Sequence, residues 1–145
     1  MEQSNQEFRQ EARRRLACYQ TRRQSIQNLE AEIHRLETAA ERLGSVQYDA
    51  VRVRGGGDRE EALLRNIALR DELKGRLEDT RQWVSVMDGA LHGLEEEERT
   101  AVEIYISQEP YAAELLAERM GVDRSTAYRR AKRALTRFTE VLFGG

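Results

Sequence analysis

Apolar residues spaced alternately three and four positions apart place the strongest constraint on how this chain folds. The first run consists of Ile26, Leu29, Ile33, Leu36, Ala40 and Leu43, and no Gly or Pro interrupts it. This spacing places every member on one side of an α-helix and is the a/d pattern of a coiled coil. Upstream, the same register puts Arg22 and Arg15 at d positions. We therefore expect the early helix either to fray or to meet a different partner.

A second run with the same spacing follows a segment that interrupts the helix. Three consecutive glycines at 55–57 precede Asp58, which is placed to cap a second helix. The second stripe consists of Leu73, Leu77, Thr80, Val84, Met87 and Leu91, with Leu63 and Ile67 extending it less regularly upstream. Neither helix can bury its stripe alone. The sequence therefore predicts a long antiparallel helical hairpin, or coiled coil, over residues 1–93 with a glycine-containing loop at 44–58.

The composition favours an all-α fold and excludes several classes of protein. Charged residues make up 34% of the chain and aromatic residues 6%, which suits solvated helices better than one large core. The single Cys18 cannot form an internal disulfide, and no apolar run approaches the roughly 18 residues that a membrane span needs. The N-terminus also lacks the apolar segment of a secretory signal. We expect a cytoplasmic protein that does not contact membranes.

Nothing in the sequence indicates catalysis. The only histidines, His34 and His92, lie on separate predicted helices without a cluster of metal-ligand spacing. The first 93 residues hold heptads where a catalytic α/β domain would be needed. We therefore expect no enzyme activity, no catalytic residues, no metal and no cofactor.

Residues 94–145 differ from the rest of the chain and have the spacing of a helix-turn-helix. Glutamates at 95–98 suit the start of a short helix, where the helix dipole favours carboxylates. Ala117 suits a close helix crossing, Gly121 suits a left-handed turn, and Asp123 is placed to cap the next helix. The expected buried residues are Leu116, Met120, Val122, Ala127, Ala131, Ala134, Leu135 and Phe138. We therefore predict a small helix-turn-helix domain after the hairpin.

The second helix of this motif is strongly cationic, although the formal net charge of the chain is −2. Residues 124–137 hold six cations and no acid, whereas residues 94–110 hold six acids and one Arg. A solvated helix usually mixes charges, so this segregation favours a surface that meets the phosphates of double-stranded DNA. Arg can contact guanine, and Ser and Thr can contact bases or phosphates. The predicted DNA-binding residues are Arg124, Ser125, Thr126, Tyr128, Arg129, Lys132 and Arg133, of which Tyr128 lies at the edge and either packs or touches DNA.

The residues of this domain resemble region 4 of bacterial sigma factors. The likeness covers Leu94 to Arg99, the pair Leu116 and Ala117, and the run GVDRSTAYRRAKRAL, in which Asp123 replaces the usual Ser. The layout of the chain is similar to small prophage regulators of the ArpU and RinA late-transcription kind. The resemblance implies a sequence-specific transcription regulator of phage type, whose second helix contacts promoter DNA and whose other surfaces contact RNA polymerase. Because the first half holds heptads, a self-sufficient sigma factor is not expected.

Two other interpretations remain open. The chain suits a coiled-coil interaction protein that binds RNA polymerase or a sigma factor without DNA contact, since 95–98 are acidic. It also suits a DNA-packaging adaptor of the small-terminase kind, although those usually carry the DNA-binding part first. We expect a homodimer through the hairpin, but pairing within one chain would satisfy the same stripe. Arg52 and Arg54, beside the glycines, are a weaker candidate for contact with a polyanion.

Overall fold

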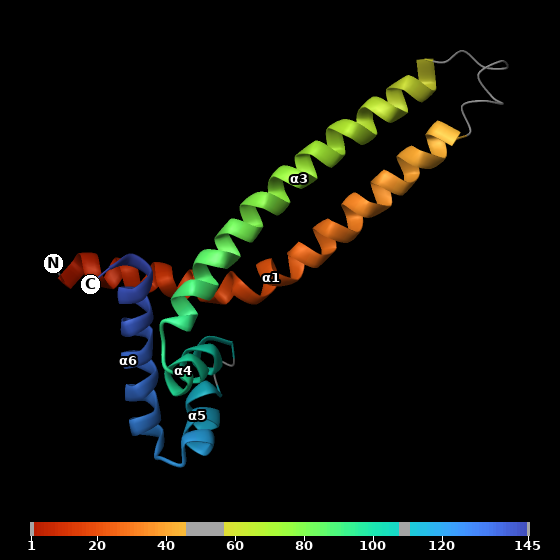
Figure 1. Ribbon diagram of the computed structural model, residues 1–145. Helices are drawn as coiled ribbons and strands as arrows, with labels where there is room; N and C mark the ends of the chain where they lie inside the picture. Colours follow the sequence, from red (N-terminus) through yellow and green to blue (C-terminus); the bar gives the residue numbers. More distant parts are fainter. Residues whose placement is uncertain (1, 46–56, 108–110, 145) are drawn as a thin grey trace. The chain divides into compact units, whose positions relative to one another are not determined.

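The structure is a computed structural model that describes residues 2–45, 57–107 and 111–144 (Figure 1). The helices are α1 (Glu2–Ser45), α3 (Gly57–His92), α4 (Glu96–Ser107), α5 (Ala112–Met120) and α6 (Arg124–Phe143). The two long helices α1 and α3 pack antiparallel, and the three short helices form a small C-terminal unit. The predicted all-α fold, a long helical hairpin followed by a small helix-turn-helix domain, is confirmed. Most of the predicted loop, with Arg52, Arg54 and the first two glycines, lies outside the described residues.

The chain divides into two compact units, and each unit takes part of both long helices. One unit is Arg22–Gln82, and the other combines Met1–Thr21 with Trp83–Gly145. The domain boundary predicted after residue 93 stays a prediction. In the second of these units the start of α1 and the end of α3 carry buried apolar side chains, as the C-terminal helices do.

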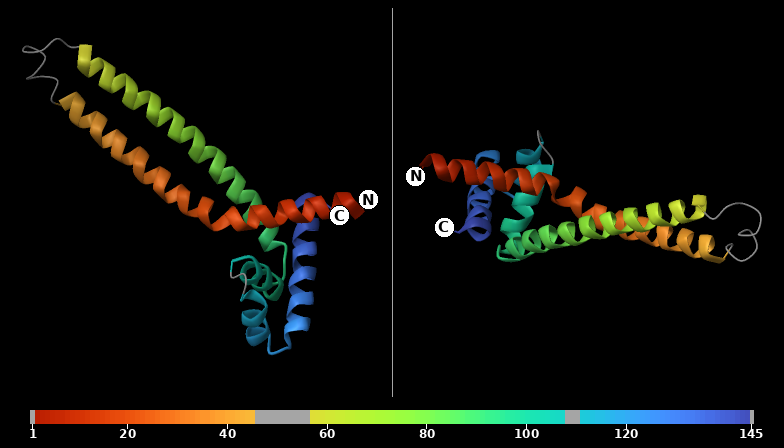
Figure 2. Two further views of the ribbon diagram at one scale, coloured as in Figure 1. Left: turned by 180° about the vertical axis from the view of Figure 1, so that it is seen from behind. Right: turned by 90° about the horizontal axis from the view of Figure 1, so that it is seen from above.

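In the unit Arg22–Gln82, the predicted apolar seam lies between α1 and α3 of one chain. Ile33, Leu36 and Leu77 are buried, and the neighbouring members of both stripes are half-buried. Figure 2 shows the two antiparallel helices side by side along this stretch. Ion pairs between Arg81 and Glu30 at 2.6 Å and between Lys74 and Glu37 at 3.7 Å also join the helices. These pairs are exposed and each stabilises by about 1 kcal/mol or less, so the seam holds the hairpin.

Part of this seam is polar. Upstream of Leu73, the alternating three- and four-residue spacing places Arg70 and then Asn66 at seam positions. Asn66 is only 8% exposed, and its side-chain amide donates a hydrogen bond to the main-chain oxygen of Leu36 at 2.9 Å. Arg70 Nε in turn donates to Asn66 Oδ1 at 2.7 Å. Ile67, which the sequence analysis added to the stripe, is 44% exposed, and that assignment is wrong because Asn66 holds the seam position.

In the other unit, the start of α1 remains helical and packs with the C-terminal helices. Its buried side chains are Ala12, Leu16 and Tyr19. The ring of Phe8 lies 5.2 Å from the ring of Phe143 near the end of α6, and the Arg15 guanidinium lies 4.9 Å from that ring. Of the two outcomes expected for the early helix, the different partner is therefore confirmed.

Candidate nucleic-acid interface

A tight turn joins α5 to α6 and sets the direction of α6. Gly121 follows the last residue of α5 with a left-handed backbone, at φ 65° and ψ 33°. The main-chain N–H of Val122 donates to the oxygen of Ala117 at 3.2 Å, as in a Schellman turn. Asp123 then occupies the N-cap position of α6 in an extended conformation. The turn predicted from the spacing of Ala117 and Gly121 is confirmed.

Small side chains hold one side of α6 against α4 and α5. The three helices pack on one another and lie together in each view (Figures 1 and 2). Of the predicted core, Met120 and Val122 are half-buried, and the buried members are Leu116, Ala127, Ala131, Ala134, Leu135 and Phe138. The alanines bring the neighbouring helices close, while Phe138 fills the space between them. One side of α6 is thereby committed to packing, and the opposite side faces outward.

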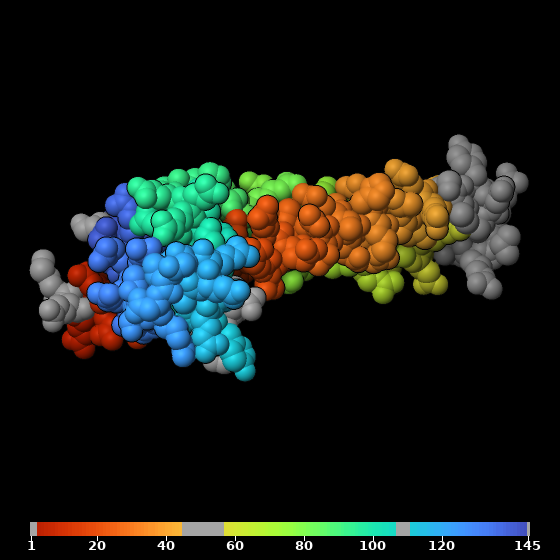
Figure 3. All heavy atoms as spheres, turned by 90° about the horizontal axis from the view of Figure 1, so that it is seen from below, coloured from red at the N-terminus to blue at the C-terminus, as the bar shows by residue number. Residues whose placement is uncertain are grey.

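The predicted DNA-binding residues all lie in the first three turns or so of α6. Thr126 is half-buried, and the exposed members are Arg124, Ser125, Tyr128, Arg129, Lys132 and Arg133. In Figure 3 the atoms of α5 and the start of α6 form a continuous part of the surface. The structure therefore brings these side chains to one accessible stretch of helix.

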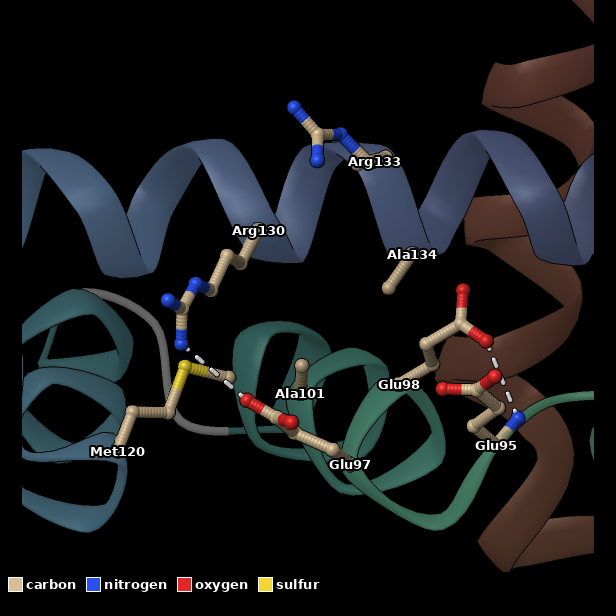
Figure 4. A pocket seen from close by; sticks show the side chains of 8 residues that line it. All are labelled: Glu95, Glu97, Glu98, Ala101, Met120, Arg130, Arg133 and Ala134. Atoms are coloured by element: carbon tan, nitrogen blue, oxygen red, sulfur yellow. Dashed lines mark hydrogen bonds and ion pairs between the residues drawn. The ribbon is translucent and has the colours of Figure 1, made fainter.

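Three of the six cations of α6 are paired with acids of the neighbouring helices. The pairs are Arg124 with Glu114 at 3.0 Å, Arg130 with Glu97 at 3.3 Å, and Arg137 with Glu98 at 3.6 Å. Figure 4 shows Arg130 extending toward Glu97 of α4. All three arginines are more than 40% exposed, so the pairs contribute little to stability. Their effect is on charge, because much of the positive charge on this flank is neutralised within the domain.

The other three cations, Arg129, Lys132 and Arg133, make no ion pair within the part of the chain that the structure describes. Arg129 Nη2 lies 3.4 Å from Thr126 Oγ1, and Lys132 Nζ lies 5.1 Å from the centre of the Tyr128 ring. Arg133 is directed away from the glutamates of α4 (Figure 4). The positive charge of α6 is thus concentrated on the side opposite its buried residues.

Asp123 and Thr126 position Arg129 at the N-terminal end of the cationic side of α6. The predicted N-cap position of Asp123 is confirmed. A hydrogen bond from the Thr126 hydroxyl lowers the pKa of Asp123 below its ordinary value, and the main-chain N–H groups of Asp123 and Thr126 and then the charge of Arg129 act in the same direction. The same hydroxyl accepts from Arg129. Thr126 therefore links the acid to the cation.

Tyr128 packs and remains accessible at the same time. Its ring meets the ring of Tyr105 from α4 edge to face, with 5.9 Å between centroids, and 40% of its surface is exposed. A hydrogen bond with Tyr105, followed by one with Lys132 and the charge of Lys132, lowers the pKa of the Tyr128 hydroxyl. The side chain therefore lies between the core and the cationic side.

The sequence analysis missed two features of this interface. It did not assign Glu97 and Glu114 as partners of α6, because ion pairs between helices leave no periodic signal. It also missed Arg13 of α1, whose guanidinium lies 5.4 Å from the ring of Tyr105. Of the three consecutive arginines at 13–15, the sequence analysis considered only Arg15, as an interruption of the heptads.

Other kinds of site receive no support among the described residues. They contain no cluster of three or more His, Cys, Asp or Glu arranged to hold a metal ion, and none of their helices is long and apolar enough to cross a membrane. A pocket of about 320 Å³ between α4 and α6 is lined largely by charged side chains, including the pair of Arg130 and Glu97 (Figure 4). The chain matches no family model, no curated protein and no solved structure with which it was compared.

Proposed function

We propose that the protein binds double-stranded DNA through α5, the turn and α6, and acts as a sequence-specific transcription regulator of phage type beside RNA polymerase. One observation supports this most strongly. The cations of α6 that face α4 and α5 pair with acids, whereas Arg129, Lys132 and Arg133 are exposed and make no ion pair among the described residues. A surface that needs only solvation has no reason to separate its charges in this way.

The proposed roles follow from the position of each side chain on α6. The first turn of a recognition helix enters the major groove, which places Arg124 and Ser125 near base edges. Arg129, Lys132 and Arg133 extend the contact to phosphates along the next two turns. Arg124 would exchange its exposed partner Glu114 for the DNA. In this proposal the protein is a binding protein and has no catalytic step.

The proposed action beside RNA polymerase has a separate basis. It rests on the likeness of residues 94–145 to region 4 of sigma factors and on the acids of α4. Glu95 and Glu96 are exposed at the start of that helix and make no ion pair among the described residues. They give the domain a second, acidic surface that suits a basic protein partner.

We also propose a homodimer, although not through the apolar seam. That seam is filled within one chain, so a second copy needs another surface. Leu64 and Ile67 of α3 are 65% and 44% exposed and lie on one side of the helix, outside the seam. They are the apolar surface that we assign to the second copy.

The test is a selection of bound sequences from a random DNA pool, followed by binding titrations on the selected site. Arg129→Ala with Lys132→Ala should weaken binding about 100-fold or more, because two contacts to DNA are lost. The matched control is Lys74→Ala with Arg76→Ala, which removes two exposed cations of α3 and should leave binding unchanged. For about five phosphate contacts, raising the salt from 50 to 200 mM should weaken binding roughly 10² to 10³ fold.

The same measurements separate the competing functions. No enrichment in the selection, with a flat response to salt, would favour a coiled-coil protein that binds polymerase or a sigma factor without DNA. A ring-sized oligomer in light scattering would favour a packaging adaptor. Equal loss of binding in the α6 and α3 double variants would contradict the assignment of the α6 surface.

A further inference from the structure

Arg129 lies at the centre of the exposed side of α6. At about 100° per residue, it is roughly 160° away from Ala127 and Ala131 around the helix axis. Both alanines are fully buried, whereas Arg129 is exposed. Arg129 also belongs to the second turn of the helix, and the N-terminal turns of a recognition helix are the ones that contact base edges. Its position is therefore that of a residue which faces the floor of the major groove.

Lys132 and Arg133 lie on either side of Arg129, about one turn later along α6. Seen along the axis, they are rotated from it by about 60° in one direction and about 40° in the other. Lys132 Nζ lies 5.1 Å from the centre of the Tyr128 ring, and Arg133 is directed away from the glutamates of α4 (Figure 4). A helix fills most of the roughly 12 Å width of the major groove, so side chains at its two flanks meet the phosphate ridges. The three cations are therefore not equivalent.

The Thr126 hydroxyl orients Arg129 toward the N-terminal end of α6. The hydroxyl accepts a hydrogen bond from Arg129 Nη2 at 3.4 Å and donates one to the Asp123 carboxylate. A hydroxyl that donates in such a chain becomes a better acceptor. A guanidinium has several N–H donors, so one bond to Thr126 leaves enough donors for a partner that accepts two. Arg129 is thus held in place before DNA arrives and keeps donors to offer.

The charge of Asp123 influences which group of the DNA Arg129 can contact. The hydrogen bond from Thr126 lowers the pKa of Asp123, so the carboxylate is ionised at neutral pH. A phosphate beside the same guanidinium would be a second anion, and Asp123 would repel it. The edge of a guanine carries no net charge and presents two acceptors, N7 and O6, which one guanidinium contacts with two hydrogen bonds. The surroundings of Arg129 therefore favour a base over a phosphate.

We propose that Arg129 reads one guanine in the major groove, while Lys132 and Arg133 contact phosphates on the two sides of that groove. This role rests on the proposed DNA-binding function and refines it, because Arg129 then supplies sequence specificity and not only charge. Thr126 is the positioning residue of the contact. The DNA site selected by the protein should therefore contain a G·C pair whose recognition depends on Arg129.

Arg129→Ala and Arg133→Ala should weaken binding in different ways, although each removes one exposed cation of α6. Arg129→Ala should lower the affinity for the selected site roughly tenfold or more, and the affinity for unrelated DNA of the same length much less. It should leave the slope of log affinity against log salt nearly unchanged. Arg133→Ala should lower both affinities equally and reduce the magnitude of that slope by about 0.9, as expected for one phosphate contact.

Replacement of single guanines in the selected site by 7-deazaguanine tests the same contact from the DNA side. This base still pairs with cytosine but lacks the N7 acceptor. At one position the replacement should weaken binding of the wild type about fivefold or more, because a hydrogen bond to a charged group is lost. Arg129→Ala should be insensitive to the replacement at that position.

Two substitutions of Thr126 test its positioning role. Thr126→Val removes the hydroxyl and should reduce the sensitivity to 7-deazaguanine, whereas Thr126→Ser keeps the hydroxyl and should retain the sensitivity. Circular dichroism of all variants should show the same helix content, so that the changes report on contact with DNA. Full sensitivity in Thr126→Val would exclude Thr126 as the positioning residue.

Other results would overturn the role of Arg129 and leave the DNA-binding function standing. Equal losses on selected and unrelated DNA in Arg129→Ala, with the same fall in slope as in Arg133→Ala, would show a phosphate contact. A selected site without guanine, or the same sensitivity to 7-deazaguanine in Arg129→Ala as in the wild type, would show that Arg129 reads no guanine. Absence of DNA binding by the wild-type protein would overturn the proposed function together with this role.

Discussion

Asn66 of α3 donates a hydrogen bond from its side-chain amide to the main-chain oxygen of Leu36 in α1, across the seam between the two helices. Apolar heptads alone allow two helices to slide past one another by whole repeats, since every repeat looks alike. A buried amide is satisfied only where a main-chain oxygen faces it, and here Arg70 satisfies its other end. This polar layer therefore fixes the register of the hairpin.

The first prediction concerns the stability of the hairpin. Asn66→Ala should lower the free energy of unfolding by about 1 to 2 kcal/mol, because the hydrogen bonds to Leu36 and from Arg70 are both lost. Urea denaturation of the full chain, followed by circular dichroism, measures the change. Asn28→Ala is the control, since Asn28 is exposed on α1. An equal effect of the two substitutions would show that the buried amide does not stabilise the hairpin.

Two glycines should respond in opposite directions to the same substitution. Gly121 has φ 65°, so Gly121→Ala should destabilise the protein by about 1 to 2 kcal/mol. Gly75 lies inside α3 with nothing within 4 Å of an added Cβ, so Gly75→Ala should stabilise it by up to about 1 kcal/mol. Thermal denaturation of the two variants measures whether each substitution raises or lowers the stability. Stabilisation by Gly121→Ala would contradict the left-handed turn between α5 and α6.

The sequence predicted those parts of the fold that depend on local periodicity and on single turns. The seam around Ile33 and Leu77 follows from the alternating three- and four-residue spacing, because an α-helix places residues with this spacing on one side. The left-handed turn at Gly121 follows from the residue itself, since few others accept that backbone conformation. The exposed position of Arg129 follows from the same helical geometry once Ala127 and Ala131 are assigned to the core.

Contacts between residues far apart in the chain could not be predicted in this way. The start of α1 packs with the end of α6 through Phe8 and Phe143, and no repeat connects those two residues. Asn66 was overlooked because a polar side chain at a seam position breaks the pattern on which the prediction depended. The pairing of Arg124 with Glu114 required the turn to be folded first. Such interactions are set by tertiary packing and not by local spacing.

The pairing of Arg124 with Glu114 yields a third prediction, on DNA affinity. Glu114→Gln should tighten DNA binding several-fold at low salt, because it frees Arg124 and removes a negative charge near the phosphates. The gain should shrink as salt rises and screens the exposed charges. The matched control is Glu118→Gln, which changes the net charge equally on the same helix. If both variants tighten binding to the same degree, the release of Arg124 is not the cause.

The lowered pKa of Asp123 gives a prediction about pH. A carboxyl group whose pKa is lower in the folded state than in the unfolded state stabilises the fold when it is ionised. For Asp123 this contribution is fully present above the unfolded pKa, near 3.8, and is lost as the pH falls through the folded pKa. Asp123→Asn should therefore be less stable than the wild type at pH 7, and the difference should disappear well below pH 3.8. Thr126→Val should reduce the difference, since the Thr126 hydroxyl is the main cause of the shift. A difference independent of pH would contradict the role of the charged carboxylate.

The last prediction concerns the homodimer. Because the apolar seam is filled within one chain, substitutions on the outer side of α3 should separate two copies without unfolding the hairpin. Light scattering of the wild type should give about twice the 16.8 kDa mass of one chain, and Leu64→Gln with Ile67→Gln should give the mass of a monomer. Leu69→Gln is the control, because Leu69 is exposed on a different side of α3. Paired half-sites in the selected DNA should accompany the dimer, since two recognition helices related by symmetry contact two half-sites. A wild type of 16.8 kDa at all concentrations would exclude the dimer and would predict a single half-site.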